Sequence, residues 1–452
     1  MIARLLTLPE RRPGFVIGLI GLLFALAYSS SLVLRPKPDG RVVTGDALHH
    51  YVQLRSVVFD RDVHFRNEYV RLYNLTGDEP GTEWVYAGTD TGHVRNLMPV
   101  GPALLWMPLF ALVSLGVWIA NLAGATYPLD GYGRLFQATA GLSGIIAATV
   151  GTWFCYLASA RMFTRRSAIW GTLTIWLASP AIYYSVISPT YSHAASLLAT
   201  GAFWLVWLAS APGARRYAAL GLLTGVAALM RWQDVILLIP IALDLVLAWR
   251  RRDIRLAQAV SFGPLAVICT AVVFTPQMLV WTAVYGRPLA MPQGEGFMRW
   301  TEPALIDVLF SDFHGLFTWT PVVLLSVAGL VLLWRRAPSV AAGAGVFLLL
   351  SWYVNAAVAD WWAGEAFGSR RFVSCVPVFV LGLSAIAERY AQPLARVSAG
   401  ATLVIGHTFL LLVQYQAFMH GVRDVAPYPR GAYNLWLARF VVPLDLLRKW
   451  TE

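Results

Sequence analysis

Ionisable residues gather most densely just after the first apolar segment, in "TGDALHHYVQLRSVVFDRDVHFRNEYVR" (residues 44–71). The pattern of residues 46–60 predicts an amphipathic helix, because side chains three, four and seven positions apart share one face of a helix. The polar face would carry Asp46, His49, His50, Gln53 and Asp60. Since most of its apolar residues lie elsewhere, such a helix suits the surface of a membrane.

Asp46 is the candidate for a catalytic residue. It follows Gly45 at the expected start of the helix, where a carboxylate can act as the general base that takes a proton from an attacking hydroxyl or amine. The helix N-terminus would favour its ionised form. The alternative is that Asp46 only caps the helix, and the spacing is compatible with both roles.

Three neighbours of Asp46 are candidates for substrate binding. His49 and His50 are interpreted as positioning or solvated side chains in preference to metal ligands. Arg55 begins a run of arginines that suits a phosphate group, although the acids of the same stretch offer ion-pair partners. These acids are Asp60, Asp62 and Glu68.

Polar residues also interrupt later apolar segments. His193, in "SPTYSHAAS", opens an expected membrane helix, and Arg231 and Asp234 interrupt "ALMRWQDVILL". Charges inside a membrane segment are costly and usually mark functional sites. Arg231 would then contact a lipid phosphate, and the alternative is a structural Arg231–Asp234 pair in a tight turn.

Two loops combine aromatic, acidic and basic residues. "DVLFSDFHGLFTWTP" (307–321) contains His314, and "ADWWAGEAFGSRRFVSCVP" (359–377) contains five more candidates. These five are Trp361, Trp362, Glu365, Arg370 and Arg371. Aromatic rings pack on the apolar face of a sugar and carboxylates bind its hydroxyls, while paired arginines suit phosphate or pyrophosphate. The alternative is an interfacial belt of aromatic residues with salt bridges.

Motifs for other chemistries are absent from the sequence. It has no P-loop, no Rossmann glycine pattern, no H-E-x-x-H and no G-x-S-x-G. Cys155, Cys269 and Cys375 lie in apolar segments and are expected to be buried thiols. We predict no cofactor and no metal ligands, and a divalent metal stays open as an alternative.

The composition is that of a polytopic membrane protein. The 452 residues are 58% hydrophobic and 13% charged, and apolar runs of about 20 residues, the length that crosses a bilayer core, recur along the chain. The net charge of +11 is concentrated in short loops, which is the pattern of cytoplasmic loops and does not indicate nucleic acid as a partner. The loop arginines are Arg161, Arg165, Arg166, Arg215, Arg216, Arg250, Arg251, Arg252, Arg255, Arg335 and Arg336.

We predict an all-α bundle of about eleven (11–13) transmembrane helices. The expected spans are 14–34, 134–160, 167–187, 193–210, 217–231, 233–249, 257–281, 316–334, 340–358, 372–388 and 397–418. Residues 98–122 are also apolar enough to span, but counting them would place the basic loops opposite Arg11 and Arg12. Three prolines interrupt this stretch, so we predict an interfacial or re-entrant element there.

This topology makes residues 1–452 a single membrane domain with its N-terminus inside. The outer face would receive a helical first loop, two further loops and the C-terminal tail. These segments are 35–133, 282–315, 359–371 and 419–452. The polar and aromatic candidates lie mainly in them, so an active site would face the exterior of a bacterial-type inner membrane.

Several motifs together resemble those of the GT-C glycosyltransferases, which include the protein O-mannosyltransferases and the aminoarabinose transferases of lipid A. They are Gly-Asp after the first span, "GLLTGVAALMRWQDVILLIP" (221–240), "HGLFTWTP" and "WWAGEAFGSRRF", and the segment 133–180. The resemblance covers about residues 1–390. Two features depart from it: Met98-Pro99-Val100-Gly101-Pro102 replaces a double proline, and His193 stands where several members carry an acid.

The resemblance implies a GT-C-type bundle and an inverting transfer of a sugar from a polyprenyl-phosphate donor to a lipid, glycan or protein acceptor. By it, Asp46 matches the catalytic aspartate of the first loop and Arg231 matches a residue near the lipid phosphate. The other candidates would shape the sugar and acceptor sites. A transporter or flippase of lipid-linked glycans is one alternative, which would place charges around a central cavity. An outer-face glycan polymerase or ligase is another and would depend more on arginines.

Overall fold

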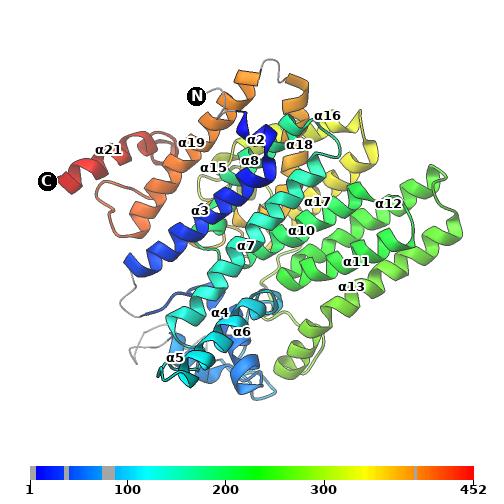
Figure 1. Ribbon diagram of the computed structural model, residues 1–452. Helices are drawn as coiled ribbons and strands as arrows, with labels where there is room; N and C mark the ends of the chain where they lie inside the picture. Colours follow the sequence, from blue (N-terminus) through cyan, green and yellow to red (C-terminus); the bar gives the residue numbers. More distant parts are fainter. Residues whose placement is uncertain (1–6, 35–39, 74–86, 391–393, 452) are drawn as a thin grey trace.

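The computed structural model describes residues 7–34, 40–73, 87–390 and 394–451. Every regular element within these ranges is a helix (Figure 1). The first half contains α2 (Leu8–Arg11), α3 (Pro13–Leu34), α4 (Asp46–Arg55), the π-helical turn η1 (Ser56–Asp60), α5 (Arg66–Tyr73), α6 (Gly101–Leu122), α7 (Arg134–Ser159), α8 (Arg165–Leu177), α9 (Ala181–Val186), α10 (Ser192–Ala209) and α11 (Ala214–Met230). The second half contains the 3-10 helix η3 (Trp232–Leu237), α12 (Leu238–Arg250), α13 (Leu256–Tyr285), α14 (Asp307–Phe310), α15 (Leu316–Trp319), α16 (Val322–Trp334), α17 (Pro338–Ala357), the 3-10 helix η4 (Arg370–Cys375), α18 (Val376–Tyr390), α19 (Leu394–Met419), α20 (Ala432–Trp436) and α21 (Ala438–Thr451).

The prediction of an all-α polytopic membrane protein is confirmed. Nine helices of the described chain are long and apolar enough to cross a membrane. Each of the eleven predicted spans coincides with a helix or with a helix broken once. The number that crosses the membrane stays a prediction, because α6 is among the nine and α8, α11 and α16 are shorter.

Four of the predicted spans are interrupted. Spans 167–187 and 316–334 break just before Pro180 and Pro321, where α8 gives way to α9 and α15 to α16. Proline has no N–H to donate to the preceding turn, so helices break there. Spans 233–249 and 372–388 begin in the 3-10 helices η3 and η4. The predicted site residue Arg231 directly precedes η3, and η4 begins with Arg370 and Arg371.

The arginine-rich loops gather at one end of the bundle, called here the arginine end. The indole of Trp170 donates to Glu10 (3.2 Å), and the Thr164 hydroxyl donates to Glu388 (2.7 Å). Arg336 lies over the ring of Phe163, 5.4 Å from its centroid. These contacts join α2 to α8, and the loop after α7 to the end of α18 and to the loop after α16. The loop arginines therefore lie at one end of the bundle, as expected. Their placement on the cytoplasmic side of a membrane stays a prediction.

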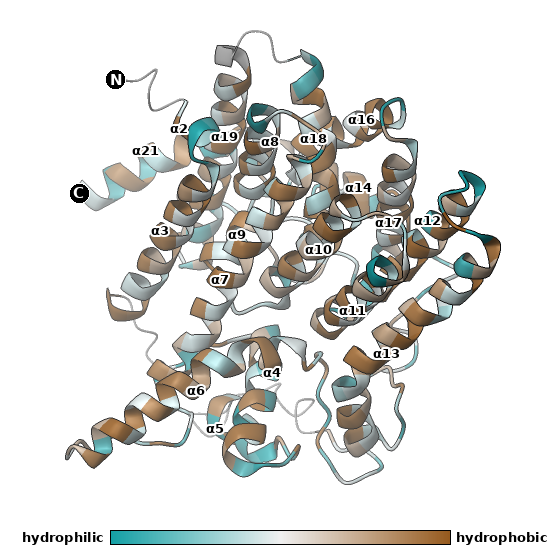
Figure 2. Cartoon of the chain, turned by 45° about the vertical axis from the view of Figure 1, so that its right-hand side comes forward, coloured by the Kyte–Doolittle hydropathy of each residue, from teal (hydrophilic) through white to brown (hydrophobic). Residues whose placement is uncertain are grey.

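Helices α4, α5 and α6 lie together at the opposite end, called here the α4 end. Figure 2 shows them beyond the ends of α3 and α7, with α6 projecting to one side. The ring of Trp106 in α6 meets His50 edge to face, with 5.9 Å between centroids, and Phe110 meets Tyr51 and Phe59 in the same way. Helix α6 therefore runs along α4.

The chain after α6 returns to α4. Asn121 exchanges two hydrogen bonds with the backbone of Tyr127 (2.8 and 2.9 Å), and the Tyr51 hydroxyl donates to the carbonyl of Gly131 (2.6 Å). The loop that follows α6 is thus anchored to Tyr51 of α4 through Gly131. Its length and composition also allow α6 to cross a membrane, so an interfacial position for 98–122 stays a prediction.

Candidate functional site

A cavity of about 590 Å³ opens at the α4 end of the bundle. It lies where α4, the residues before α6, η3, the loop after α13, the end of α17 and η4 meet. Its charged residues are Asp46, Arg231, Asp360, Arg370 and Arg371. Its other lining residues are Leu97, Met98, Pro99, Ser192, His193, Trp232, Gln233, Val235, Ile236, Met291, Gln293, Phe297, Met298, Trp300, Val354 and Val358. One cavity therefore combines acids, arginines and an extensive apolar wall.

Asp46 is the first residue of α4, and its carboxylate lies in the cavity wall. Gly45 precedes it with φ +59°, and a Cβ at that position would lie 2.5 Å from the Tyr191 hydroxyl, so only glycine fits this turn. No side-chain hydrogen bond caps the helix. The carboxylate instead forms an ion pair with Arg370 at 3.0 Å, and its side chain is 34% exposed.

Opposing effects act on the pKa of Asp46. Burial raises it, but Arg370, His49, His50 and Arg371 lower it, and the net effect is a pKa below the ordinary value. The geometry of the Arg370 pair supports this direction, since a cation at hydrogen-bonding distance favours the charged carboxylate. Asp46 is therefore ionised at neutral pH.

His49 and His50 lie behind the cavity wall and not in it. Burial lowers the pKa of each to about 4, so both imidazoles are neutral at pH 7. His50 Nδ1 donates to the carbonyl of Pro99 (2.8 Å), and His49 Nδ1 lies 2.7 Å from the Tyr69 hydroxyl. The two rings thus contact Tyr69 and the backbone of Pro99, and a positioning role for both histidines stays a prediction.

Residues 96–100, called here the strap, run between α4 and α13, and Leu97, Met98 and Pro99 of the strap line the cavity. Gln53 donates to the carbonyl of Met98 (3.1 Å), and the backbone N–H of Val100 donates to Gln277 of α13 (2.8 Å). Gln293 also donates to the carbonyl of Leu97 (2.9 Å). The strap has no regular structure of its own, so these side chains supply the partners that its backbone needs.

The three arginines of the cavity have different partners. Arg370 pairs with Asp46, and Arg371 pairs with Asp360 at 2.8 Å. Arg231 instead donates to His193 Nδ1 and to Gln233 Oε1, the latter at 3.1 Å. Arg231 is thus the cavity arginine whose hydrogen-bond partners are both neutral, among the residues that the structure describes.

The contact with Arg231 also defines the tautomer of His193. A guanidinium can only donate, so His193 Nδ1 accepts and Nε2 carries the proton. His193 lines the cavity, and it can offer this N–H to an acceptor atom of a ligand. The sequence indicated His193 and Arg231 as site candidates, but it did not indicate that they contact each other.

Asp234 does not line the cavity. It is 1% exposed and accepts hydrogen bonds from Ser196 of α10 (2.7 Å) and Ser374 of η4 (3.0 Å). A direct Arg231–Asp234 ion pair is not among these contacts, because Arg231 turns to His193, although the two buried charges still attract each other. A direct substrate contact by Asp234 would require it to leave this buried position.

The remaining candidates lie outside the cavity wall. Arg55 pairs with Asp60 and with Glu68 (2.8 Å) and lies over the Tyr132 ring, so it follows the ion-pair alternative. The ring nitrogens of His314 contact the carbonyl of Trp362 (2.6 Å) and the Tyr428 hydroxyl. Three more candidates from the 359–377 loop are also absent from the cavity lining: Trp361, Trp362 and Glu365.

Sequence reasoning missed several residues of the wall. Trp232 and Gln233 follow Arg231 directly, and Gln293 and Trp300 come from the loop after α13. They are neutral and follow no helical spacing, so only their nearness to Arg231 and to the predicted outer loop could have indicated them. Among the described residues, no group of three His, Cys, Asp or Glu side chains is arranged to hold a metal ion.

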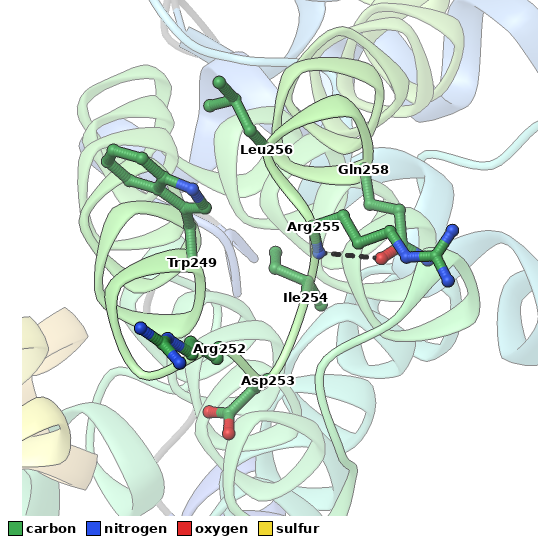
Figure 3. A pocket seen from close by; sticks show the side chains of 7 residues that line it. All are labelled: Trp249, Arg252, Asp253, Ile254, Arg255, Leu256 and Gln258. Atoms are coloured by element: carbon green, nitrogen blue, oxygen red, sulfur yellow. Dashed lines mark hydrogen bonds between the residues drawn. The ribbon is translucent and has the colours of Figure 1, made fainter.

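A second hollow of about 670 Å³ lies in the turn between α12 and α13, within one of the arginine-rich loops (Figure 3). Arg252 and Arg255 point to different sides of it, and the Arg255 backbone N–H donates to Gln258 (2.8 Å). None of the predicted site residues lines it. The α4-end cavity is therefore the candidate site.

Comparison with known proteins gives a likeness of fold. No protein-family model and no curated protein matches the chain. The fold is similar to the crystal structure of ArnT from Cupriavidus metallidurans bound to undecaprenyl phosphate, with 15% sequence identity and a TM-score of 0.49. The similarity covers 95% of this chain and 76% of that one.

Gly101 gives a test of how α6 supports the site. A Cβ on Gly101 would lie 2.2 Å from the carbonyl oxygen of Leu229, two residues before Arg231, whereas a Cβ on Gly116 of the same helix meets nothing within 4 Å. We expect Gly101→Ala to lower stability by about 1–3 kcal/mol, because the added methyl pushes α6 away from α11. Thermal unfolding in detergent measures this, with Gly116→Ala as the matched control. Equal melting temperatures for the two variants would contradict the close contact.

Proposed function

We propose that the chain is a membrane-embedded glycosyltransferase that moves a sugar from a polyprenyl-phosphate donor to an acceptor. The observation that supports it most is the α4-end cavity, in which an ionised Asp46 lies beside three arginines and an apolar wall. The arginines suit a phosphate, and the apolar wall suits a prenyl chain. We place the site on the exterior side of a bacterial-type inner membrane, because the loop arginines gather at the other end.

Arg231 and His193 would hold the donor phosphate. Arg231 has no carboxylate partner in the cavity, so it can bind an anion without breaking an ion pair. The His193 Nε2–H would donate a second, uncharged hydrogen bond to the same phosphate. Val235, Val354 and Val358 of the wall would contact the first isoprene units.

The proposed reaction is one displacement at the sugar C1. The acceptor oxygen or nitrogen attacks C1 from the side opposite the phosphate, and the C1–O bond to the phosphate breaks with its electron pair leaving on the phosphate. Asp46 receives the proton of the acceptor. The products are the glycosylated acceptor and the polyprenyl phosphate, and the configuration at C1 is inverted.

Arg370 makes Asp46 a weak base, since it lowers the pKa of the carboxylate. Proton transfer to such a base becomes favourable only as the new bond to C1 forms and acidifies the acceptor. The larger share of the rate enhancement would then come from the arginines, which stabilise the negative charge that develops on the phosphate.

Because the arginines would contribute more to the rate than the weak base Asp46, a ligase or polymerase is the second candidate function. Both carboxylates of the cavity wall, Asp46 and Asp360, are paired with arginines, and such an enzyme would depend on the arginines more than on a base. The transporter alternative has less support, because the charges of the cavity gather at one end of the bundle and not around its middle.

Replacement of Asp46 tests the proposed base. We expect Asp46→Asn to lower the transfer rate about 10²–10⁴-fold, the usual contribution of general base catalysis. The measurement is transfer from a panel of radiolabelled polyprenyl-phosphate sugars by purified protein, with and without EDTA. Asp90→Asn is the control, because Asp90 is an exposed acid of the same outer region.

Full activity of the Asp46→Asn enzyme, together with loss of activity in Arg231→Gln, would contradict the base and favour the ligase or polymerase alternative. Loss of activity in EDTA would show a metal requirement that the proposal does not include.

The pH dependence tests the ion pair. A lowered pKa means that Asp46 stays ionised as the pH falls, so the acid limb of kcat/KM should lie below the ordinary carboxyl pKa of about 4. Arg370→Gln removes the cation and leaves burial, which raises the pKa, so its limb should move to higher pH. An acid limb at the same pH in both enzymes would contradict the assignment to Asp46.

A further inference from the structure

Three segments of the bundle meet at the buried side chain of Asp234. Its Oδ2 accepts hydrogen bonds from the hydroxyls of Ser196 in α10 (2.7 Å) and Ser374 in η4 (3.0 Å), and the two hydroxyl oxygens lie 2.8 Å apart. Asp234, Ser196 and Ser374 are 1%, 0% and 2% exposed. We call these three residues the clasp.

Each member of the clasp lies close in sequence to a residue of the cavity wall. The Asp234 N–H donates to the carbonyl of Arg231 (2.9 Å), which closes the first turn of η3. Ser196 lies three positions after His193, so both fall on one side of α10. Ser374 lies in η4, the single 3-10 segment that begins with Arg370 and Arg371.

A carboxylate in this position is costly unless its hydrogen bonds are made. Burial of an ionised group away from water requires partners of good geometry, and the two serine hydroxyls are such partners. An apolar residue would fill the same place without this cost, so the clasp needs a reason other than packing. Its hydrogen bonds are directional, and they fix the relative positions of α10, η3 and η4.

We propose that Asp234 is a positioning residue that holds His193, Arg231 and the Arg370–Arg371 pair at the spacing which binds the phosphate of the donor. The clasp acts through the three segments and does not touch the substrate. This inference rests on the proposed function, since it supposes that the cavity binds a polyprenyl phosphate.

Binding of undecaprenyl phosphate to the full-length protein in nanodiscs tests the clasp without requiring turnover. Undecaprenol, which lacks the phosphate, is the ligand control. We expect Ser196→Ala/Ser374→Ala to weaken binding of the phosphate about tenfold, because a shift of the arginines by a fraction of an ångström misplaces their hydrogen bonds. Binding of undecaprenol should not change.

The matched control is Ser159→Ala/Ser384→Ala. The hydroxyls of Ser159 and Ser384 form a buried hydrogen bond of the same length, 2.8 Å, between α7 and α18. This double variant removes the same chemical groups from the core but leaves no buried charge without partners, so it should lower thermal stability less than the clasp double variant does. Its binding of undecaprenyl phosphate should equal that of the wild type.

The variants Asp234→Asn and Asp234→Ala distinguish the effect of the clasp hydrogen bonds from the effect of the negative charge on Asp234. The amide oxygen of asparagine can accept both serine hydroxyls, so Asp234→Asn should keep binding within about threefold of the wild type, whereas Asp234→Ala should lose about tenfold. An Asp234→Ala protein and a clasp double variant that both bind as the wild type does would overturn the inference. A wild type that binds undecaprenol and its phosphate equally would overturn the proposed function and the inference with it.

Discussion

The site depends on keeping three guanidinium groups in place at the edge of an apolar helix bundle. A buried cation loses its hydration, and it has to be compensated by an acid, by hydrogen bonds or by a ligand. Arg370 and Arg371 are compensated by Asp46 and Asp360. Arg231 has only neutral hydrogen-bond partners, so an anionic ligand would complete its surroundings. On the proposed function, this difference would leave Arg231 to bind the anion while Arg370 stays with Asp46.

The breaks in the helices follow from the same constraint. An arginine in the middle of a regular membrane helix would point to lipid or to a neighbouring helix, but one at a helix end can turn into a cavity. Arg231 lies between α11 and η3, and Arg370 opens η4. The strap and the loop after α13 close the cavity over these ends. The strap backbone is satisfied by Gln53 of α4, Gln277 of α13 and Gln293. The loop after α13 bonds to the end of α17, where the N–H groups of Arg299 and Ala304 donate to the carbonyls of Ala357 and Ala356, so irregular chain is tolerated here.

The sequence predicted the helices better than it predicted which of their faces meet. A charge in an apolar tract is rare and costly, so Arg231 could be identified. Arg370 and Arg371 were indicated as an arginine pair beside aromatic residues in a loop, and helical spacing with the GT-C resemblance indicated Asp46. The other candidates differ in whether their side chains point into the cavity or toward a neighbouring element. Arg55 and His49 lie near Asp46 in sequence, but they turn to Glu68 and Tyr69, and no spacing rule distinguishes an inward side chain from one that faces a neighbouring element.

The neutral residues of the cavity wall could not be predicted from the sequence, for a different reason. Gln233 and Gln293 carry no charge and stand in no motif, and they join the cavity only because a 3-10 turn and a loop bring them there. The clasp is a similar case, since serines at 196 and 374 are ordinary residues until the fold places them on one carboxylate. Long-range packing, and not local propensity, decides such contacts.

We propose that the α4-end cavity binds the phosphate of a polyprenyl carrier at Arg231. The most direct test of this proposal is an electron-microscopy structure of the protein in nanodiscs with added undecaprenyl phosphate. We expect phosphate density within hydrogen-bonding distance of the Arg231 guanidinium and His193 Nε2, with the prenyl chain along the apolar wall. Phosphate density at the arginine end, or an α4-end cavity that stays empty at saturating ligand, would contradict it.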